Sequence, residues 1–136
     1  MAGMSPRRPE NTALPLPSDA ELRILRQLWI GGEQTVREVH EHLEGEWPVG
    51  YTTILKLLQR MLEKGLVARR AEGRMHWYRA AAPRERTERR LVRHIVDRVF
   101  GGSVGELLHA ALPPSTASDR ELEEIRRVIA RLAGGA

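Results

Sequence analysis

The apolar residues of this chain change their spacing once, at Gly65, and this change constrains the fold more than any other feature. Between residues 18 and 64 they recur at the 3.6-residue spacing of helices, in three segments separated by glycines. After Gly65 they alternate with polar residues in two short runs on either side of Glu72-Gly73. The sequence therefore predicts three helices followed by a β-hairpin.

Local signals place the starts of the first two helices. Ser18 with Glu21, and Thr35 with Glu38, form capping boxes, in which each side chain bonds the backbone of the other residue. Gly31-Gly32 ends the first helix. The predicted inner faces consist of Leu22, Leu25, Leu28 and Trp29 in the first helix, Val36, Val39 and Leu43 in the second, and Ile54, Leu55, Leu57, Leu58, Met61 and Leu62 in the third.

Three helices and a hairpin in this order are typical of a winged helix, in which the second and third helices form a helix-turn-helix and the hairpin is the wing. We expect a mainly α fold with a small β-hairpin wing, as a winged helix-turn-helix domain over residues 18–82. Residues 1–17 contain four prolines and no periodicity, which predicts a disordered arm. The sequence has neither a membrane-spanning stretch nor a signal peptide, so we expect a cytoplasmic protein.

Residues 83–136 are predicted to form a helical dimerisation tail. Their apolar residues lie in three helical stripes, interrupted at Phe100-Gly101-Gly102 and Pro113-Pro114, with Ser103 and Ser118 as caps. Three such stripes exceed what a tail of this length can bury against itself. We therefore predict an intertwined homodimer. The expected interface residues are Leu91, Ile95, Val99, Leu107, Leu108, Leu122, Ile125 and Ile129.

Basic residues are concentrated around the third helix and the hairpin. The chain has 22 Lys and Arg against 18 Asp and Glu, and all but two of the basic residues are Arg. Residues 51–79 alone hold seven basic residues against two acidic ones. Such a block predicts a polyanionic partner, of which nucleic acid is one and a membrane surface or an acidic protein are others.

Four short motifs, in this order along the chain, resemble those of the penicillinase-repressor family of bacterial transcription factors, the BlaI/MecI/CopY type. They are the run from Trp29 to Val39, Tyr51-Thr52-Thr53, Glu63-Lys64-Gly65-Leu66 and Phe100-Gly101-Gly102-Ser103. The similarity extends over nearly the whole chain. It implies a dimeric winged-helix repressor on an inverted-repeat operator of double-stranded DNA, with the third helix in the major groove and the tail helices forming the dimer.

The resemblance also assigns residues to DNA. The positions that match the family's recognition helix are Thr52, Thr53, Lys56 and Arg60. Hydroxyls at a helix N-terminus allow a close approach to phosphate, and a Lys or Arg one or two turns later can bond a phosphate or a base edge. The residues on or beside the wing that are expected to contact the backbone or the minor groove are Arg69, Arg70 and Arg74, of which Arg74 is favoured.

Two signalling features of the family are absent from the sequence. Copper-responsive members carry Cys-x-Cys pairs in the tail, whereas this chain has no cysteine and hence no thiolate ligand or disulfide. Resistance-regulating members are cut by a sensor protease at an Asn-Phe bond, which would align with Ala110-Ala111, and no Asn-Phe pair occurs here. Control by such a protease is therefore not expected.

The histidines give little support to a metal site. His40 and His42 are two positions apart on a helix, so their side chains point in nearly opposite directions and cannot share an ion. The tail leaves one arrangement open, composed of His94 and His109 with Asp97 or Glu106. We expect neither a metal nor a cofactor.

Two other classes of function compete with DNA binding. Catalysis is not expected, because Gly101-Gly102 follows a helix rather than a strand and Ser103 has no accompanying His-Asp arrangement. A winged helix can also serve as a protein-interaction module without specific DNA binding. The basic surplus and the polar face of the third helix argue against that alternative.

Overall fold

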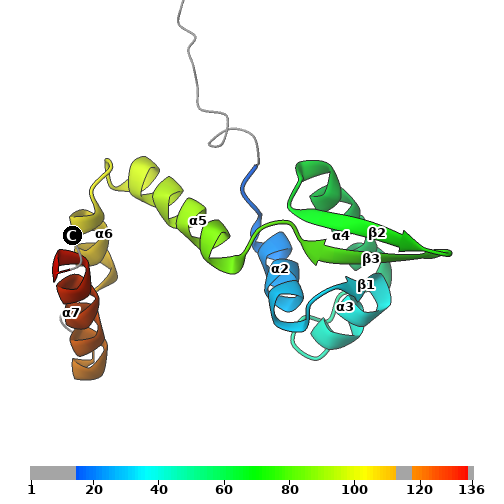
Figure 1. Cartoon of the computed structure of the whole chain (residues 1–136), viewed down its shortest axis with the longest axis horizontal. Helices are drawn as coiled ribbons and strands as arrows, with labels where there is room; N and C mark the ends of the chain where they lie inside the picture. The colour runs from blue at the N-terminus through cyan, green and yellow to red at the C-terminus, as the bar shows by residue number, and fades with distance from the viewer. Residues whose placement is uncertain (1–14, 113–117, 135–136) are drawn as a thin grey trace, which may run out of the picture. The chain divides into compact units, whose positions relative to one another are not determined.

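The computed structural model describes residues 15–112 and 118–134 (Figure 1). Most of the arm expected over residues 1–17 lies outside the described residues, and so does the break expected at Pro113-Pro114. The chain divides into two compact units, Met1–Leu91 and Val92–Ala136. The expected division into residues 18–82 and 83–136 remains a prediction.

Three helices open the first unit: α2 (Asp19–Gly31), α3 (Val36–Leu43) and α4 (Tyr51–Lys64). Both predicted capping boxes are present. Ser18 Oγ accepts a hydrogen bond from Glu21 N at 3.2 Å, and Glu21 Oε1 accepts one from Ser18 N at 2.9 Å. Thr35 and Glu38 repeat this exchange at 3.2 and 3.0 Å. The structure thus confirms the predicted starts of the first two helices.

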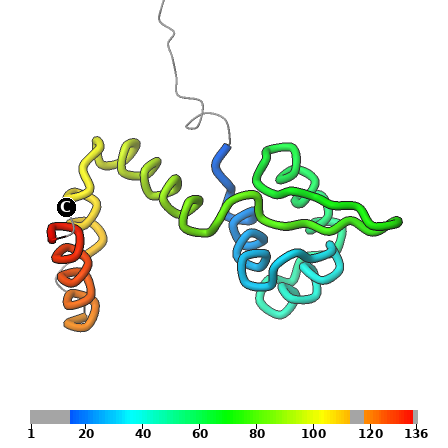
Figure 2. The backbone as a smooth tube through the Cα atoms, viewed as in Figure 1, coloured from blue at the N-terminus to red at the C-terminus, as the bar shows by residue number. Residues whose placement is uncertain are grey.

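A three-stranded antiparallel sheet follows, in the order β1-β3-β2. Strands β2 (Val67–Glu72) and β3 (Met75–Ala80) are the predicted hairpin (Figure 2). Gly73, with a φ of 63°, lies in the turn between them. Strand β1 (Gln34–Thr35) pairs with β3 and was not predicted. Two residues are too short to show an alternating pattern, so periodicity alone does not reveal this strand.

The core of the first unit lies among the three helices and the sheet. Its buried apolar residues are Ile24, Leu25, Leu28, Val36, Val39, Leu43, Ile54, Leu58, Met61, Leu66, Val67 and Tyr78. The predicted inner face of the first helix is partly wrong, because Glu21 and Ile24 are fully buried whereas Leu22 and Trp29 are only partly buried. Glu21 forms an ion pair with Lys64 of α4, and this pair allows a charged side chain to face inward.

Three further helices are α5 (Arg84–Val99), α6 (Val104–Ala111) and α7 (Asp119–Gly134). As predicted, Ser103 Oγ accepts from Glu106 N and Ser118 Oγ accepts from Glu121 N, each at 3.1 Å. Helix α5 begins in the first unit and ends in the second. Among the described helices, none is long and apolar enough to cross a membrane.

The second unit leaves most of its large apolar side chains uncovered in the single chain. Val96 is fully buried, but α6 and α7 contain no buried residue. None of the eight predicted interface residues is buried. The exposed large apolar residues of this unit are Val92, Ile95, Val99, Val104, Leu108, Val128, Ile129 and Leu132.

Candidate nucleic-acid interface

Helix α4 has one buried and one exposed side, as the sequence predicts. Ile54, Leu58 and Met61 are fully buried against the core. The four polar residues expected to contact DNA, which are Thr52, Thr53, Lys56 and Arg60, are all exposed. Because the apolar side fixes the helix to the domain, these polar side chains are held on one surface.

The N-terminus of α4 has no side-chain cap. Its N-cap is Gly50, whereas Ser or Thr side chains bond the first turns of α2, α3, α6 and α7. The first turn of α4 also contains no acidic residue. The amides of Tyr51 and Thr52 have no partner within the helix, because the residues that would accept their bonds precede it. This helix end therefore presents free donors and the positive end of a helix dipole.

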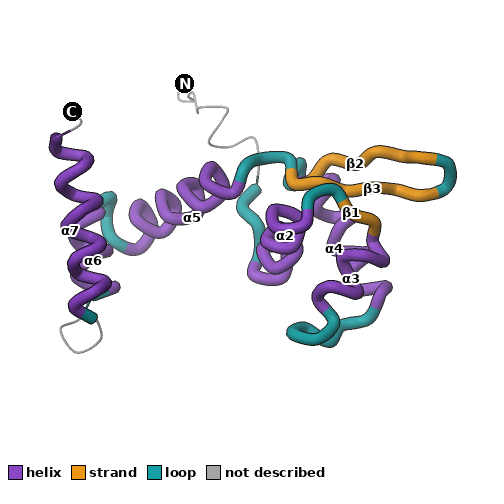
Figure 3. Tube along the Cα trace, turned by 60° about the horizontal axis from the view of Figure 1, so that its bottom comes forward, coloured by secondary structure: helices purple, strands orange, loops and turns teal. Residues whose placement is uncertain are grey.

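A loop leads from α3 into α4 (Figure 3), and side-chain contacts with α3 fix its end. His40 on α3 forms a 3.0 Å hydrogen bond between Nε2 and the carbonyl oxygen of Val49. Its ring also meets the ring of Tyr51 edge to face, at 6.1 Å between centroids. The residues that begin α4 are thus anchored without any polar group of α4 itself being used.

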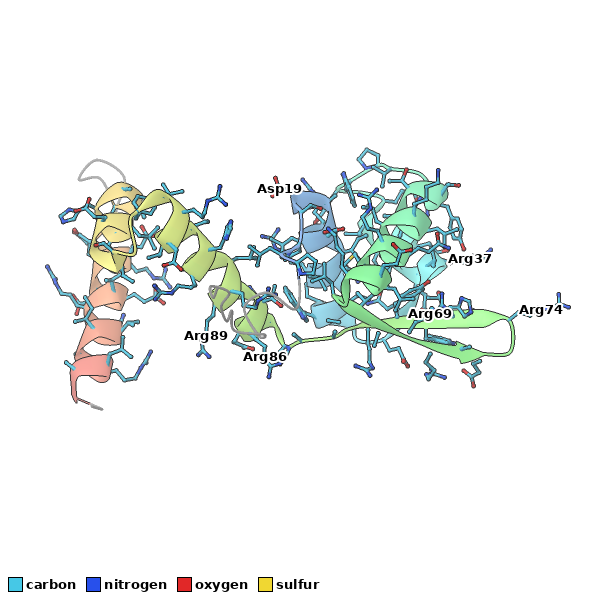
Figure 4. The ribbon with its side chains drawn as sticks, turned by 90° about the horizontal axis from the view of Figure 1, so that it is seen from above. Asp19, Arg37, Arg69, Arg74, Arg86 and Arg89 are labelled. Carbon is cyan, nitrogen blue, oxygen red and sulfur yellow. The ribbon has the colours of Figure 1, made fainter. Side chains whose placement is uncertain are left out.

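Two of the three predicted wing residues have free guanidinium groups. Arg69 and Arg74 are exposed, and neither forms an ion pair within the described part of the chain. Arg74 projects from the tip of the hairpin (Figure 4). A cation at the end of an extended hairpin can reach a polyanion that the body of the domain does not touch.

Arg70 differs from Arg69 and Arg74 because its guanidinium group already binds acidic side chains. Its Nη2 lies 2.8 Å from Glu33 Oε1, its Nη1 lies 3.2 Å from Glu72 Oε1, and its guanidinium covers the ring of Trp77. The hydrogen bond from Arg70 lowers the pKa of Glu33, and the bonds to Glu33 and Glu72 raise the pKa of Arg70. The pair joins the wing to the segment before β1.

Ion pairing divides the basic block of residues 51–79 into two groups. Lys64 and Arg70 have carboxylate partners, Glu21 for the first and Glu33 with Glu72 for the second. The remaining five form no ion pair within residues 15–112 and 118–134. These five are Lys56, Arg60, Arg69, Arg74 and Arg79.

The structure adds one basic residue that the sequence analysis did not single out. Arg37, in the first turn of α3, is exposed and has no carboxylate partner among the described residues. It lies near the wing in Figure 4, whereas Arg86 and Arg89 lie on α5. In the sequence, Arg37 directly follows Val36 on the predicted inner face of the second helix, and this position could have indicated an exposed cation.

No three His, Asp or Glu side chains of the described residues gather closely enough to hold a metal ion. Trp77 Nε1 is the one buried side-chain nitrogen or oxygen atom there without a hydrogen-bond partner. The chemistry of this surface is therefore that of cations, hydroxyls and free amides, which suits a phosphate backbone.

The chain is similar over most of its length to known transcriptional regulators. The model of the penicillinase repressor family matches residues 17–131. The transcriptional regulator BlaI of Mycobacterium tuberculosis strain H37Rv is 32% identical over 120 residues, which cover 86% of this chain and 85% of that protein. The methicillin resistance regulatory protein MecI of Staphylococcus aureus strain N315 is 19% identical over 112 residues, which cover 82% of this chain and 91% of that protein.

Two solved structures have lower coverage of this chain. The solution structure of the DNA-binding domain of the repressor BlaI is 27% identical, with a TM-score of 0.47, over 52% of this chain and 89% of that one. The solution structure of monomeric Bacillus licheniformis BlaI in complex with the blaP half-operator is 28% identical, with a TM-score of 0.47, over 53% of this chain and 88% of that one.

Proposed function

This chain belongs to the penicillinase repressor family of DNA-binding transcriptional repressors, and we propose that it binds an inverted-repeat operator as a homodimer through α4 and the wing. The observation that carries the proposal is the surface of α4, where an uncapped N-terminus adjoins exposed hydroxyls and unpaired cations. No acidic residue of the first turn competes with a phosphate there.

Helix α4 has the width and composition for the major groove. An α-helix with its side chains is about 10–12 Å across, which matches the width of that groove. Thr52 and Thr53 lie beside the free amides, so they suit a phosphate or a nearby base edge. Lys56 and Arg60 follow on the same exposed side, where Arg60 can contact a phosphate or guanine.

The wing and α3 supply backbone contacts in this proposal. Arg69 and Arg74 are exposed and unpaired in the described chain, and Arg37 adds a third cation near the wing. Arg70 contributes only if a phosphate replaces Glu33 as its partner, because both bind the same guanidinium. We therefore propose Arg69, Arg74 and Arg37 as the principal backbone contacts outside α4, with Arg70 as a conditional one.

The helical tail is proposed to form the dimer. Leaving its exposed apolar side chains in water is unfavourable in free energy, and a second copy offers a surface of the same composition on which they can be buried. The proposed interface keeps the eight residues predicted from the sequence, of which Ile95, Val99, Leu108 and Ile129 are exposed in the single chain. Residues 83–136 are then the dimerisation region, and residues 18–82 the DNA-binding domain.

The proposal assigns no catalytic role to the chain and places it in the cytoplasm, with the DNA it binds. The sequence has neither an Asn-Phe pair nor a cysteine. We propose that release from DNA uses neither cleavage of an Asn-Phe bond nor thiolate-bound copper.

Fluorescence anisotropy tests the proposal directly. The full chain is titrated into labelled DNA from its own upstream region and into a shuffled duplex, between about 50 and 200 mM salt. We expect tight binding to the native duplex, a steep salt dependence and saturation at two chains per site. Equal, weak binding to both duplexes would contradict the proposal and favour the protein-interaction alternative.

A further inference from the structure

Glu21 is the one charged side chain that is fully buried among the described residues. Both of its carboxylate oxygens accept hydrogen bonds from Lys64 Nζ, at 2.8 and 2.9 Å. Oε1 also accepts the bond from Ser18 N that closes the capping box. A buried carboxylate is costly unless charge and hydrogen bonds compensate it, and here both are present.

The pair connects two helix ends that are 43 residues apart in the sequence. Glu21 lies in the first turn of α2, and Lys64 is the last residue of α4. Gly65, with a φ of 81°, ends the helix directly after Lys64. The pair therefore holds the C-terminal end of α4, while the contacts of His40 hold the segment before its N-terminus.

The carboxylate remains charged at neutral pH. Burial alone would raise the pKa of Glu21, but the hydrogen bonds and charge of Lys64, together with Ser18, outweigh burial and lower it. Lys64 is thereby drawn toward the domain interior, where 28% of its side chain remains exposed, and is not available to DNA.

We propose that Glu21 is a positioning residue for operator binding, which through Lys64 sets the direction in which α4 presents Arg60. This inference rests on the function proposed above. Lys64 lies one helical turn after Arg60, about 6 Å along the axis, whereas Thr52 is about 18 Å away. A change in the direction of α4 at this end therefore displaces Arg60 much more than the threonines.

Stability alone does not account for this pair. Replacing a buried ion pair by apolar residues of similar volume is often neutral or stabilising, so the pair is weak evidence for a contribution to folding. Its specific effect is directional, because two bonds from one Nζ to one carboxylate fix where the end of the helix lies.

The test compares Glu21→Gln with the original chain in the same anisotropy assay. Glutamine keeps the shape and an oxygen that accepts from Ser18 N, but it removes the charge that holds Lys64. We expect operator affinity to fall about tenfold, the order of one lost phosphate or base contact. Affinity for the shuffled duplex should not fall, because no cation is removed from the DNA surface.

A second background separates positioning from general destabilisation. In an Arg60→Ala chain the same Glu21→Gln change should cost less than about twofold, since the side chain that it misplaces is already absent. Equal losses with and without Arg60 would overturn the inference, as would unchanged operator affinity in folded Glu21→Gln. Glu88→Gln breaks the exposed Arg84–Glu88 pair on α5 and is the matched control, which should bind as the original chain does.

The double change Glu21→Gln with Lys64→Met covers the case in which Glu21→Gln does not fold. It removes the pair without leaving an unpaired buried charge. Affinity loss for the operator in this variant supports the inference, and binding equal to the original chain refutes it. If the original chain itself does not distinguish operator from shuffled DNA, the proposed function fails and the inference fails with it.

Discussion

Gly50→Asp should stabilise the winged domain and weaken operator binding at the same time. Gly50 has a φ of −77° and a ψ of 164°, close to the −74° and 172° of the N-cap Ser18. A Cβ atom built on Gly50 would meet nothing within 4 Å. An aspartate can therefore adopt this backbone conformation, and its side chain can cap α4, which has no side-chain cap at Gly50.

The two effects have different sizes and opposite signs. Capping gains a few tenths of a kcal/mol over glycine, and a negative charge at the helix N-terminus adds about 0.3–1 kcal/mol. A total near 1 kcal/mol raises the melting temperature by about 4–8 °C for a domain of this size. A carboxylate about 6 Å from a DNA phosphate costs about 1–3 kcal/mol at effective dielectric constants between those of water and a protein surface, which weakens binding about 5- to 150-fold.

Thermal unfolding followed by circular dichroism measures the first effect, and operator anisotropy at fixed salt measures the second. Gly50→Asn is the matched control, because asparagine caps the helix without a charge. It should raise the melting temperature and weaken binding less than Gly50→Asp does. A raised melting temperature with unchanged operator affinity in Gly50→Asp would refute the idea that phosphate approaches this end of α4.

Three further changes test neighbouring parts of the surface. Arg60→Ala should weaken operator binding by about 1–3 kcal/mol, and a loss confined to one operator position would identify a base contact. Glu33→Gln removes one of the two carboxylate partners of Arg70, so that binding to a shuffled duplex should tighten and the salt slope of the proposed dimer should steepen by about two; unchanged affinity and slope would mean that Arg70 does not reach DNA. The native pKa of Glu21 is lowered from its usual value near 4.5, so its contribution to stability is present above that pH and is lost as the pH falls through the native pKa. The difference in unfolding free energy between the original chain and Glu21→Gln, measured in urea, should therefore shrink between pH 7 and pH 3, and a constant difference would contradict this.

Periodicity and capping signals were sufficient to predict the winged domain. The two capping boxes, the amphipathic pattern of α4 and the hairpin around Gly73 all depend on residues near one another in the sequence. Such local signals survive without tertiary information. Strand β1 is missed because it pairs Thr35 with Trp77, far along the chain, and a strand of two residues has no sequence pattern that indicates this pairing.

Ion pairing was the part of the candidate site that the sequence could not reveal. The sequence predicts a DNA contact for Arg69, Arg70 and Arg74 alike and favours Arg74, yet it does not indicate that only Arg70 is bonded to acidic residues. Its main partner, Glu33, lies 37 residues earlier in the chain. The same limit applies to Glu21. The sequence predicts its role in the capping box with Ser18, but it does not reveal the bond that Glu21 accepts from Lys64. Long-range pairing of this kind depends on how the helices and strands assemble.

These pairs limit how much of the basic block DNA can use. Five of its seven cations are unpaired in the described chain, and Arg37 adds a sixth in each protomer of the proposed dimer. If all six met phosphates in both protomers, the logarithm of the binding constant would fall with the logarithm of salt at a slope of about −11, which is therefore the steepest slope that these residues allow. If Arg70 exchanges Glu33 for phosphate, the slope steepens beyond this value, and the Glu33→Gln chain then has the same slope as the original chain but binds shuffled DNA more tightly, because no ion pair has to break. The salt dependence of the original chain and of Glu33→Gln thus distinguishes an Arg70–Glu33 ion pair that persists on DNA from one in which phosphate displaces Glu33.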